Sequence, residues 1–384
     1  MRAILILLLT TRIVIADSKP GDEGTPEHQK AASLVKQLGD KRYATREAAA
    51  KALVEMGPAA VPALTAGSKS DDEEIRNRSI ALLPQAKAAE WKRRAEAYLK
   101  NEDGKQKHDL PLLAEWEKLT GKPNAGSRKL FAEMIRTNGD LLQQAASDPA
   151  KANAAVKAKC GAWASQGAVG ARQAPAEPGE LAAVFFVHGR VSKDRGDWGV
   201  TDHPSQLLAN PGVADAMAAK DVGPAMRRLL AHWADSRPAD DMTSHQYFGL
   251  AVRKSPFPEA VPVLAKVAKD SKASGLNVRA IAIEALGKIG DSDAKAALEG
   301  LITNSTSLFQ GVVGQEFRVG DSAFAALVTA HGKNPADYGE TGAMSIGFRT
   351  AAQGEIVRLD LRSFPNSEAR EKGLKKWKEE TGKK

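Results

Sequence analysis

Residues Pro258–Ile302 read PEAVPVLAKVAKDSKASGLNVRAIAIEALGKIGDSDAKAALEGLI and contain two amphipathic helical patterns. The apolar residues of the second pattern recur at intervals of one and three, as on one face of a helix: Val278, Ile281, Ala282, Ala285, Leu286 and Ile289. Asn277 is expected to cap this helix, and Gly290 to end it in the left-handed conformation. Two short amphipathic helices cannot bury both apolar faces alone, so the sequence predicts neighbouring helix pairs of the same kind.

Such neighbours occur elsewhere in the chain. Residues 58–64 read PAAVPAL and residues 258–264 read PEAVPVL, so five of the seven positions are identical. The second helix repeats with the spacing R-x2-A-x2-A-L-x3-G, which is met by Arg46, Ala49, Ala52, Leu53 and Gly57 and again by Arg279, Ala282, Ala285, Leu286 and Gly290. Weaker copies follow Arg76 and Gly320. Internal repetition of this kind is typical of stacked arrays.

The prolines of the repeat have a physical role in its first helix. Pro58 and Pro258 suit a first helical turn, whereas Pro62 and Pro262 lie one turn further in, where the missing N–H is expected to bend the helix. With these features the sequence resembles the HEAT-repeat family, over residues 45–85 and 256–302 and less closely over 318–338. The order of segments resembles bacterial HEAT-repeat proteins with predicted export signals.

The resemblance implies paired antiparallel helices and an arginine, early in each second helix, that pairs with an acidic residue of an adjacent repeat. In this chain the arginines are Arg46 and Arg279, and the candidate partners are Asp40 and Asp270. We therefore predict an all-α fold, an irregular HEAT-like α-α solenoid over residues 27–339 with a polar interruption at 189–204.

The remaining segments complete this predicted architecture. Thr45 is expected to cap the second helix, and residues 72–83 and 90–100 to form separate helices. Residues 303–320 read as a loop and residues 356–362 as a short strand. In the C-terminal segment, 340–384, a helix over 367–381 is expected to cover the end of the array with Leu374 and Trp377.

The N-terminus predicts export. Residues 1–16 combine a basic start, an apolar run and small residues at Val14 and Ala16, as in a signal peptide cleaved before Asp17, and a polar linker follows over 17–26. Arg12 interrupts the apolar run, so a mis-chosen start codon or a buried first strand remains an alternative. The run is too short to span a bilayer. We expect a periplasmic or secreted protein without a transmembrane segment.

Composition and motifs argue against recognised chemistry. The chain has no nucleotide-binding glycine motif, no G-x-S-x-G, no C-x-x-C and no H-E-x-x-H. None of its seven histidines is followed by Glu, whereas one iron-dependent hydroxylase with HEAT repeats uses His-Glu pairs as ligands. The only cysteine, Cys160, has apolar neighbours at helical spacing and is expected to be buried. We therefore predict no cofactor, no catalytic residue and no disulfide.

The polar interruption holds the one constellation that suggests a metal or acid–base site: His188, Arg190, Asp194, Asp197, Trp198, Asp202 and His203. Of these, His188, Asp202 and His203 are the candidate metal ligands. Because Asp and His are also common in ordinary turns, a solvated loop is the favoured interpretation. Asp240, Asp241 and His245 form a second, weaker group, in which Asp240 is expected to cap a helix.

The charge distribution suggests a further alternative. The net charge is +8, and a basic solenoid can bind nucleic acid or another polyanion. The candidate contacts are Lys92, Arg93, Arg94, Arg227 and Arg228 beside Trp91 and Trp233. Basic and acidic residues are interspersed, however, and export would separate the protein from DNA, so nucleic acid is not the favoured partner.

These observations favour a non-catalytic scaffold or adaptor of the cell envelope that binds a protein partner on the concave face of the solenoid. The two alternatives are a metal-dependent or hydrolytic enzyme that uses the loop at 188–203 and a nucleic-acid or polyanion binder that uses the basic helices.

Overall fold

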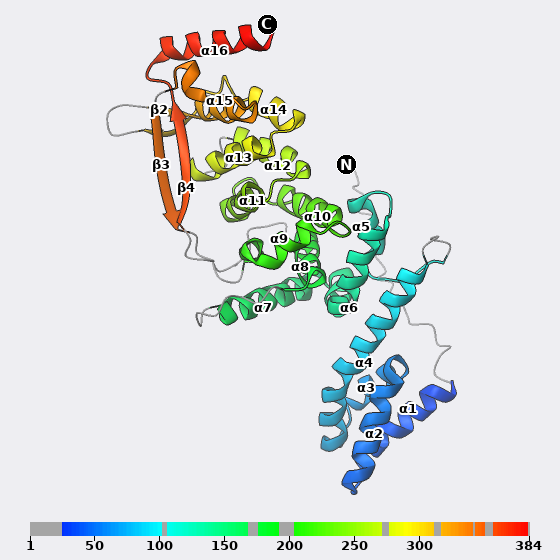
Figure 1. Ribbon diagram of the computed structural model, residues 1–384. Coiled ribbons are helices and arrows are strands. Elements are labelled where there is room, and N and C mark those ends of the chain that lie inside the picture. Colours follow the sequence, from blue (N-terminus) through cyan, green and yellow to red (C-terminus); the bar gives the residue numbers. More distant parts are fainter. Residues whose placement is uncertain are drawn as a thin grey trace, which may run out of the picture. The chain divides into compact units, whose positions relative to one another are not determined.

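The structure, a computed structural model, describes residues 25–101, 106–167, 176–191, 203–270, 276–310, 316–340, 342–349 and 356–382. The chain forms two compact units, one that ends at Trp91 and one that begins at Lys92 (Figure 1). The predicted signal peptide, residues 1–16, lies outside the described residues. Of the predicted linker, residues 17–26, only Thr25 and Pro26 are described. None of the helices in the described ranges combines the length and the apolar character needed to cross a membrane.

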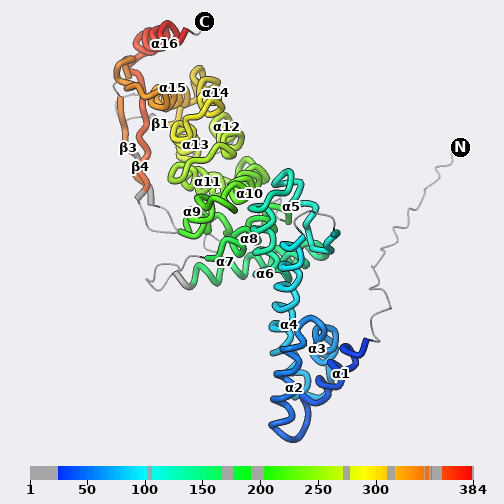
Figure 2. The backbone as a smooth tube through the Cα atoms, turned by 45° about the vertical axis from the view of Figure 1, so that its right-hand side comes forward, coloured from blue at the N-terminus to red at the C-terminus, as the bar shows by residue number. Residues whose placement is uncertain are grey.

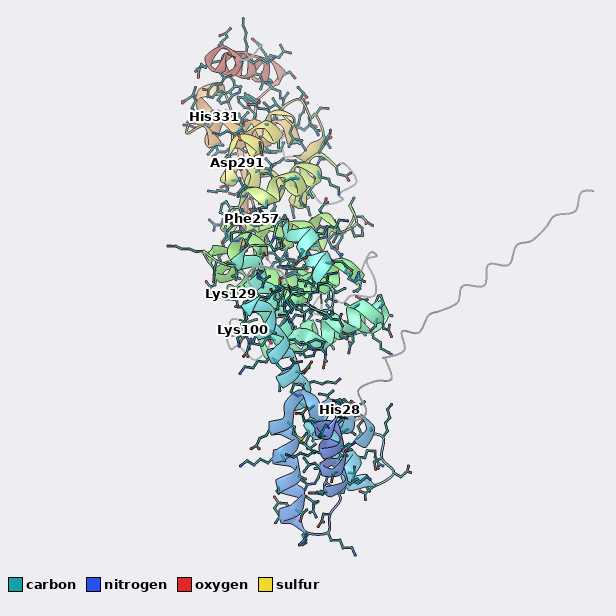
Figure 3. The ribbon with its side chains drawn as sticks, turned by 90° about the vertical axis from the view of Figure 1, so that its right-hand side faces the viewer. His28, Lys100, Lys129, Phe257, Asp291 and His331 are labelled. Carbon is teal, nitrogen blue, oxygen red and sulfur yellow. The ribbon has the colours of Figure 1, made fainter. Side chains whose placement is uncertain are left out.

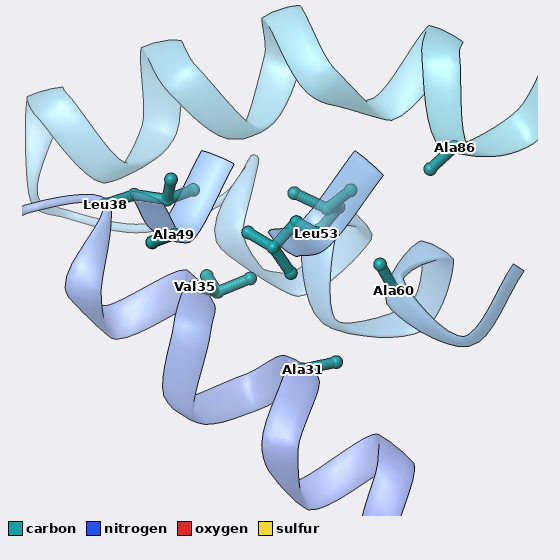
Figure 4. Close-up of a cluster of buried hydrophobic side chains, with 8 residues drawn as sticks. Ala31, Val35, Leu38, Ala49, Leu53, Ala60 and Ala86 are labelled. Atoms are coloured by element: carbon teal, nitrogen blue, oxygen red, sulfur yellow. The ribbon is translucent and has the colours of Figure 1, made fainter. Parts of the chain in front are cut away.

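The N-terminal unit consists of two helix pairs. The first pair is α1 (Pro26–Gln37) and α2 (Tyr43–Met56), and the second is α3 (Val61–Gly67) and the first part of α4 (Glu73–Lys100). The repeated small and branched residues meet in one core, shown in Figure 4: Ala31, Val35, Leu38, Ala49, Leu53, Ala60, Leu64 and Ala86. Alanines on the inner faces let the helix axes approach closely, as the repeat pattern predicts.

The repeated prolines shape the start of the first helix in both copies. A 3-10 turn, η1 (Gly57–Ala60) or η3 (Pro258–Ala260), precedes the α-helix, and Pro62 or Pro262 then occupies the first α-helical turn. The missing proline N–H therefore falls where an α-helix leaves that donor unused, so the prediction that these prolines lie one turn inside the α-helix was wrong. Gly57 and Gly290 end their helices, as predicted, and both have positive φ angles, +54° and +63°.

The C-terminal unit is a longer helical array that begins with the last part of α4. Its helices are α5 (Leu113–Thr120), α6 (Ala125–Ser147), α7 (Pro149–Gly167), α8 (Pro178–Val191), α9 (Pro211–Ala218), α10 (Gly223–Asp235), α11 (Met242–Lys254), α12 (Val261–Lys269), α13 (Leu276–Ile289), α14 (Ser292–Glu299), α15 (Val319–Ala330) and α16 (Ser367–Thr381). Short 3-10 turns η2 (Pro204–Ala209) and η4 (Pro335–Tyr338) lie between them.

Successive helix pairs stack in chain order along this unit (Figure 2). Helix α8 packs on α6 and α10, α13 packs on α11 and α12, and α15 packs on α13 and α14. The labelled residues Lys129, Phe257, Asp291 and His331 follow one another along the same column (Figure 3). This arrangement confirms the predicted all-α, HEAT-like fold class.

Several local predictions were wrong. Thr45 lies inside the first turn of α2, and the residue before that helix, Arg42, has its N–H bound by the Asp40 carboxylate at 2.8 Å. Asn277 likewise lies within the first turn of α13. The two helices expected at 72–83 and 90–100 are one helix, α4, which continues through Pro84 because that exposed position tolerates a lost hydrogen bond.

Two antiparallel hairpins interrupt the helices of the C-terminal unit. Residues expected to form a loop instead contain β1 (Ser307–Gln310) paired with β2 (Glu316–Arg318). The predicted strand is β4 (Ile356–Ser363), and its partner β3 (Gly342–Arg349) was not predicted because its glycines and small residues weaken the strand pattern. Pairing runs from Gly342 opposite Ser363 to Arg349 opposite Ile356.

Helix α16 covers the end of the array, as predicted. Trp377 is buried, and its ring lies within 6 Å of the rings of Phe324, Tyr338 and His331. Leu374 is half-buried beside it. The terminal tier therefore buries its aromatic core under a helix whose outer face is charged.

Candidate functional site

Two groups of polar residues that are separate in the sequence meet in one buried cluster of the C-terminal unit. His188, His203, Arg237, Asp241 and His245 form this histidine cluster, and each is at most 7% exposed. They come from the last turn of α8, the start of η2, the turn after α10 and the first turn of α11. The sequence suggested His188 with His203, and Asp241 with His245, but it gave no sign that the pairs share a site.

Local capping bonds hold two members of the histidine cluster in place. The Nδ1 atom of His203 accepts the N–H of Ser205 at 3.2 Å, which caps η2. Asp241 caps α11, because its carboxylate accepts the N–H of Ser244 at 3.0 Å. The expected cap, Asp240, is therefore wrong by one residue. These two caps bring the Nε2 atom of His203 to 4.0 Å from the Asp241 carboxylate.

His188 is held as a neutral acceptor. The indole N–H of Trp233 donates to its Nδ1 atom at 2.8 Å, and the guanidinium of Arg237 lies 3.4 to 3.5 Å from both ring nitrogens. Burial and the charge of Arg237 hold the pKa of His188 well below its usual range. Burial also lowers the pKa of His245. The ring of His188 lies against that of His203, with 5.7 Å between their centroids.

This geometry disfavours a metal ion at His188. Its Nδ1 lone pair is already engaged with Trp233, and the nearby positive charge of Arg237 would repel a cation. In the described ranges of the chain, no group of three or more His, Cys, Asp or Glu side chains is placed to hold a metal. Four members of the predicted constellation lie outside the described residues: Asp194, Asp197, Trp198 and Asp202. A fifth member, Arg190, forms an ion pair with Glu115 at 2.8 Å.

The arginines of the repeats bind main-chain carbonyl groups. The side chains of Arg46, Arg76 and Arg279 donate to the carbonyls of Asp40, Ser70 and Ala268 at 2.9, 2.8 and 3.0 Å. Each carbonyl lies at the end of the preceding helix or in the turn after it, where helices leave acceptors unused. Arg46 also forms an ion pair with the carboxylate of Glu74 in the next repeat at 3.1 Å. The predicted partner, Asp40, therefore binds Arg46 through its main-chain carbonyl, and the acidic side chain is that of Glu74. These contacts support the fold.

Four of the proposed nucleic-acid contacts are buried or bound within the protein. Trp91 and Trp233 are buried, so neither is placed to stack on a base. Arg227 pairs with Glu259 at 3.3 Å and donates to the carbonyl of Met217, and Arg228 donates to the carbonyl of Thr120.

Cys160 is buried, as predicted.

A different surface stands out in the N-terminal unit. The large apolar side chains that are most exposed among the described residues are Tyr43 at 65%, Ile80 at 54%, Leu99 and Val54, and all but Leu99 belong to this unit. Tyr43 and Val54 lie three turns apart on one face of α2, and Ile80 lies on α4, the second helix of the next repeat. We refer to these three residues as the exposed apolar group.

Ion pairs connect the two helices that carry the exposed apolar group. Arg78 of α4 pairs with Glu47 of α2 at 2.8 Å and with Glu74 at 2.6 Å. Both acids are about half exposed, so these pairs contribute little to stability, although one of them joins the two helices. Aromatic residues such as Tyr43 are enriched at protein interfaces.

The comparisons with known proteins identify the repeats. A family model of HEAT repeats matches residues 227–312, and a model of the PBS lyase HEAT-like repeat matches residues 45–70. The chain contains HEAT repeats. These matches cover most of α10, all of α11–α14 and part of the N-terminal unit, and they include Arg46 and Arg279.

Other comparisons add little to the HEAT assignment. A solved structure of human deoxyhypusine hydroxylase in complex with glycerol aligns with 14% sequence identity over 80% of this chain and 98% of that chain, with a TM-score of 0.23. A superposition that loose supports no argument about function. No curated protein sequence matches the chain.

Proposed function

We propose that the protein is a non-catalytic, protein-binding scaffold or adaptor of the cell envelope. The observation that carries the proposal is the exposed apolar group, Tyr43, Val54 and Ile80, on the second helices of two consecutive HEAT repeats. A solvated tyrosine and isoleucine at the surface of a folded unit stabilise it little, whereas buried in an interface they supply much of the binding energy.

The histidine cluster supports a structural role over an enzymatic one. His188 is fully buried and its acceptor nitrogen is engaged, so it is not placed to exchange protons with a substrate. The buried tryptophans and paired arginines similarly disfavour the nucleic-acid alternative. The envelope location rests on the predicted signal peptide, and cleavage before Asp17 is its test: the exported chain should begin at that residue by N-terminal sequencing.

The binding proposal is tested by capture of partners with matched variants. The protein and its variant with Tyr43→Ala and Ile80→Ala are used as bait in separate envelope and cytoplasmic extracts. We expect one envelope protein to be enriched by the natural chain and its recovery to fall about tenfold with the variant. Leu99→Ala is the control, because it removes an exposed apolar side chain elsewhere on α4. Equal recovery by all three baits would contradict the proposal.

A further inference from the structure

The hairpin β3–β4 has two edges, and side chains of the array cover one of them. Arg253 of α11 donates to the carbonyl of Arg358 at 2.8 Å, and the carboxylate of Glu284 in α13 accepts the N–H of Asp360 at 2.9 Å. Arg253 and Glu284 also pair with each other at 2.7 Å. Two main-chain groups on the outer edge of β4 are therefore bound by side chains that take the place of a neighbouring strand.

The register of the hairpin then fixes the direction of the main-chain groups in β3. Arg358 lies opposite Gly347, and Asp360 lies opposite Ser345. Because Arg358 and Asp360 direct their main-chain groups toward the helices, these are non-hydrogen-bonded pairs, and Gly347 and Ser345 direct theirs away from β4. The two-residue period of a strand adds Ala343 to the same outer edge.

Among the described residues, no strand is paired with this outer edge of β3. Across the described parts of the chain, no hydrogen bond uses the outward main-chain groups of Ala343, Ser345 or Gly347. The strand contains no proline or lysine, and its ladder runs from Gly342 to Arg349 without a bulge. Natural edges are normally protected by such features, so their absence here indicates a strand that accepts another strand. Figure 1 shows β3 on the side of the hairpin away from the helices.

Charge on the solvent face of the hairpin indicates which strand fits. Arg358 and Arg362 are exposed on β4. Between them, the carboxylate of Asp360 accepts a hydrogen bond from the hydroxyl of Ser345. Only small, exposed residues of β3 separate these arginines from the open edge. A strand added to β3 would lie ~10 Å from β4, so its glutamate side chains would reach over β3 to the guanidinium groups.

We infer that the outer edge of β3 binds an extended acidic segment of a partner protein by antiparallel or parallel strand addition. The main chain of the segment pairs with Ala343, Ser345 and Gly347, and its alternate acidic side chains meet Arg358 and Arg362. This inference rests on the proposed scaffold function, but it concerns a surface of the C-terminal unit that is separate from the exposed apolar group.

Synthetic peptides test the inference on the full chain. The probe is the fluorescent peptide EVEVEVE, compared with KVKVKVK for charge and with EVEPEVE for main-chain pairing. Fluorescence anisotropy measures binding, and amide hydrogen exchange reports protection of residues 343–347. We expect EVEVEVE to bind at least about tenfold more tightly than either comparison peptide and to slow exchange at Ser345 and Gly347. Equal binding of EVEVEVE and EVEPEVE would overturn strand addition.

Ser345→Pro removes the central outward N–H without removing a hydrogen bond to β4, because that N–H points away from the hairpin. The matched variant Ser345→Ala keeps the N–H and loses only the hydroxyl. We expect Ser345→Pro to weaken EVEVEVE binding about tenfold and Ser345→Ala to change it less than about threefold. Equal loss in both variants would place the effect in the side chain and overturn the inference.

Arg358→Glu tests the charge preference without altering the carbonyl that Arg253 binds. We expect this variant to weaken binding of EVEVEVE and to strengthen binding of KVKVKVK, whereas an unchanged preference would overturn the acidic partner. A second copy is the other occupant of an open edge. If light scattering shows a dimer that Ser345→Pro converts to a monomer, a second copy occupies β3 and the inference is wrong.

The two proposals fail in distinguishable ways. Loss of capture by the variant Tyr43→Ala with Ile80→Ala, with no binding of EVEVEVE by the natural chain, overturns only the β3 inference. Peptide binding that depends on Ser345, with capture unaffected by the variant, overturns only the proposed role of the exposed apolar group.

Discussion

Arg370 of α16 forms a two-pronged ion pair with Asp321 of α15, with nitrogen–oxygen distances of 2.7 and 2.8 Å. Asp321 is 2% exposed, so this pair attaches the terminal helix to helix α15 inside the protein. The bidentate geometry matches the fork of a guanidinium to a carboxylate. The pair joins residues 49 positions apart, and the sequence patterns did not indicate it.

Asp321→Ala should destabilise the protein by about 3 kcal/mol, because it leaves the Arg370 guanidinium partly buried without its counter-charge. Urea unfolding followed by circular dichroism measures the change. Adding Arg370→Met should recover part of the loss, since it removes the stranded charge. Glu379→Gln, which breaks an exposed pair with Lys375 at 4.0 Å, should change stability by less than about 0.5 kcal/mol. Additive losses in the double variant would contradict the coupling.

Glu340 predicts a pH dependence in the same tier. Both of its carboxylate oxygens are buried without hydrogen bonds, and burial followed by repulsion from Asp321 raises its pKa to about 9. The positive charges of Arg362 and Arg370 act in the opposite direction and lower the pKa of Glu340. Arg370 is also the ion-pair partner of Asp321.

Between its ordinary pKa of 4.5 and about 9, the unfolded chain ionises Glu340 while the folded chain keeps it protonated. The stability contributed by the protonated form is complete at low pH and is lost as the pH rises through this window. Glu340→Gln should therefore be more stable than the natural protein by about 3 kcal/mol near pH 7, with no difference below about pH 4. Urea unfolding across this pH range measures both curves, and parallel curves would exclude the effect.

The sequence predicted the repeats well because their pattern is local. Spacing of Arg, Ala, Leu and Gly identified α2 and α13, and positive φ angles at Gly57 and Gly290 confirm the predicted helix ends. The strand β3 was missed for a physical reason. Its residues form a strand because β4 pairs with them along their whole length, and this tertiary pairing overrides a weak local propensity.

The histidine cluster shows why the candidate site was only partly predictable. His188 and His203 were noticed because they lie near one loop, but Arg237, which sets the charge around His188, gave no signal in the sequence. Its burial depends on how α8, α10 and α11 stack, and that follows from packing of whole helices. A lone arginine after a helix is otherwise an ordinary surface residue. The boundaries proposed at residues 26, 339 and 340 stay predictions.

His188 predicts loss of stability in acid. Its folded pKa is well below its ordinary 6.5, first because of burial and then because of Arg237, so below about pH 6.5 the unfolded chain binds the proton more readily. Stability should fall as the pH drops from about 7 toward 5. His188→Asn keeps an acceptor for Trp233 without a titrating group and should flatten this fall, as measured by urea unfolding and tryptophan fluorescence.

The exposed His232 provides the control for this pH effect, since His232→Asn should leave the slope unchanged. His245 is also buried with a lowered pKa, so some acid sensitivity should persist in His188→Asn. A slope that both single variants alter equally would show that the pH effect does not originate at His188.

Two glycines of α8 should respond to the same substitution with opposite signs. A Cβ atom at Gly179 would lie 2.6 Å from the main-chain carbonyl carbon of Glu133, where α6 crosses, whereas the nearest atom to a Cβ at Gly189 is Trp233 Cδ1 at 3.6 Å. Gly179→Ala must push two helix backbones apart and should cost roughly 1–3 kcal/mol. Gly189→Ala fits at ordinary contact distance and should stabilise by roughly 0.5–1 kcal/mol, because alanine restricts the unfolded chain and favours helix. Urea unfolding of both variants measures the difference, and a loss of similar size in each would mean that helix crowding does not distinguish the two positions.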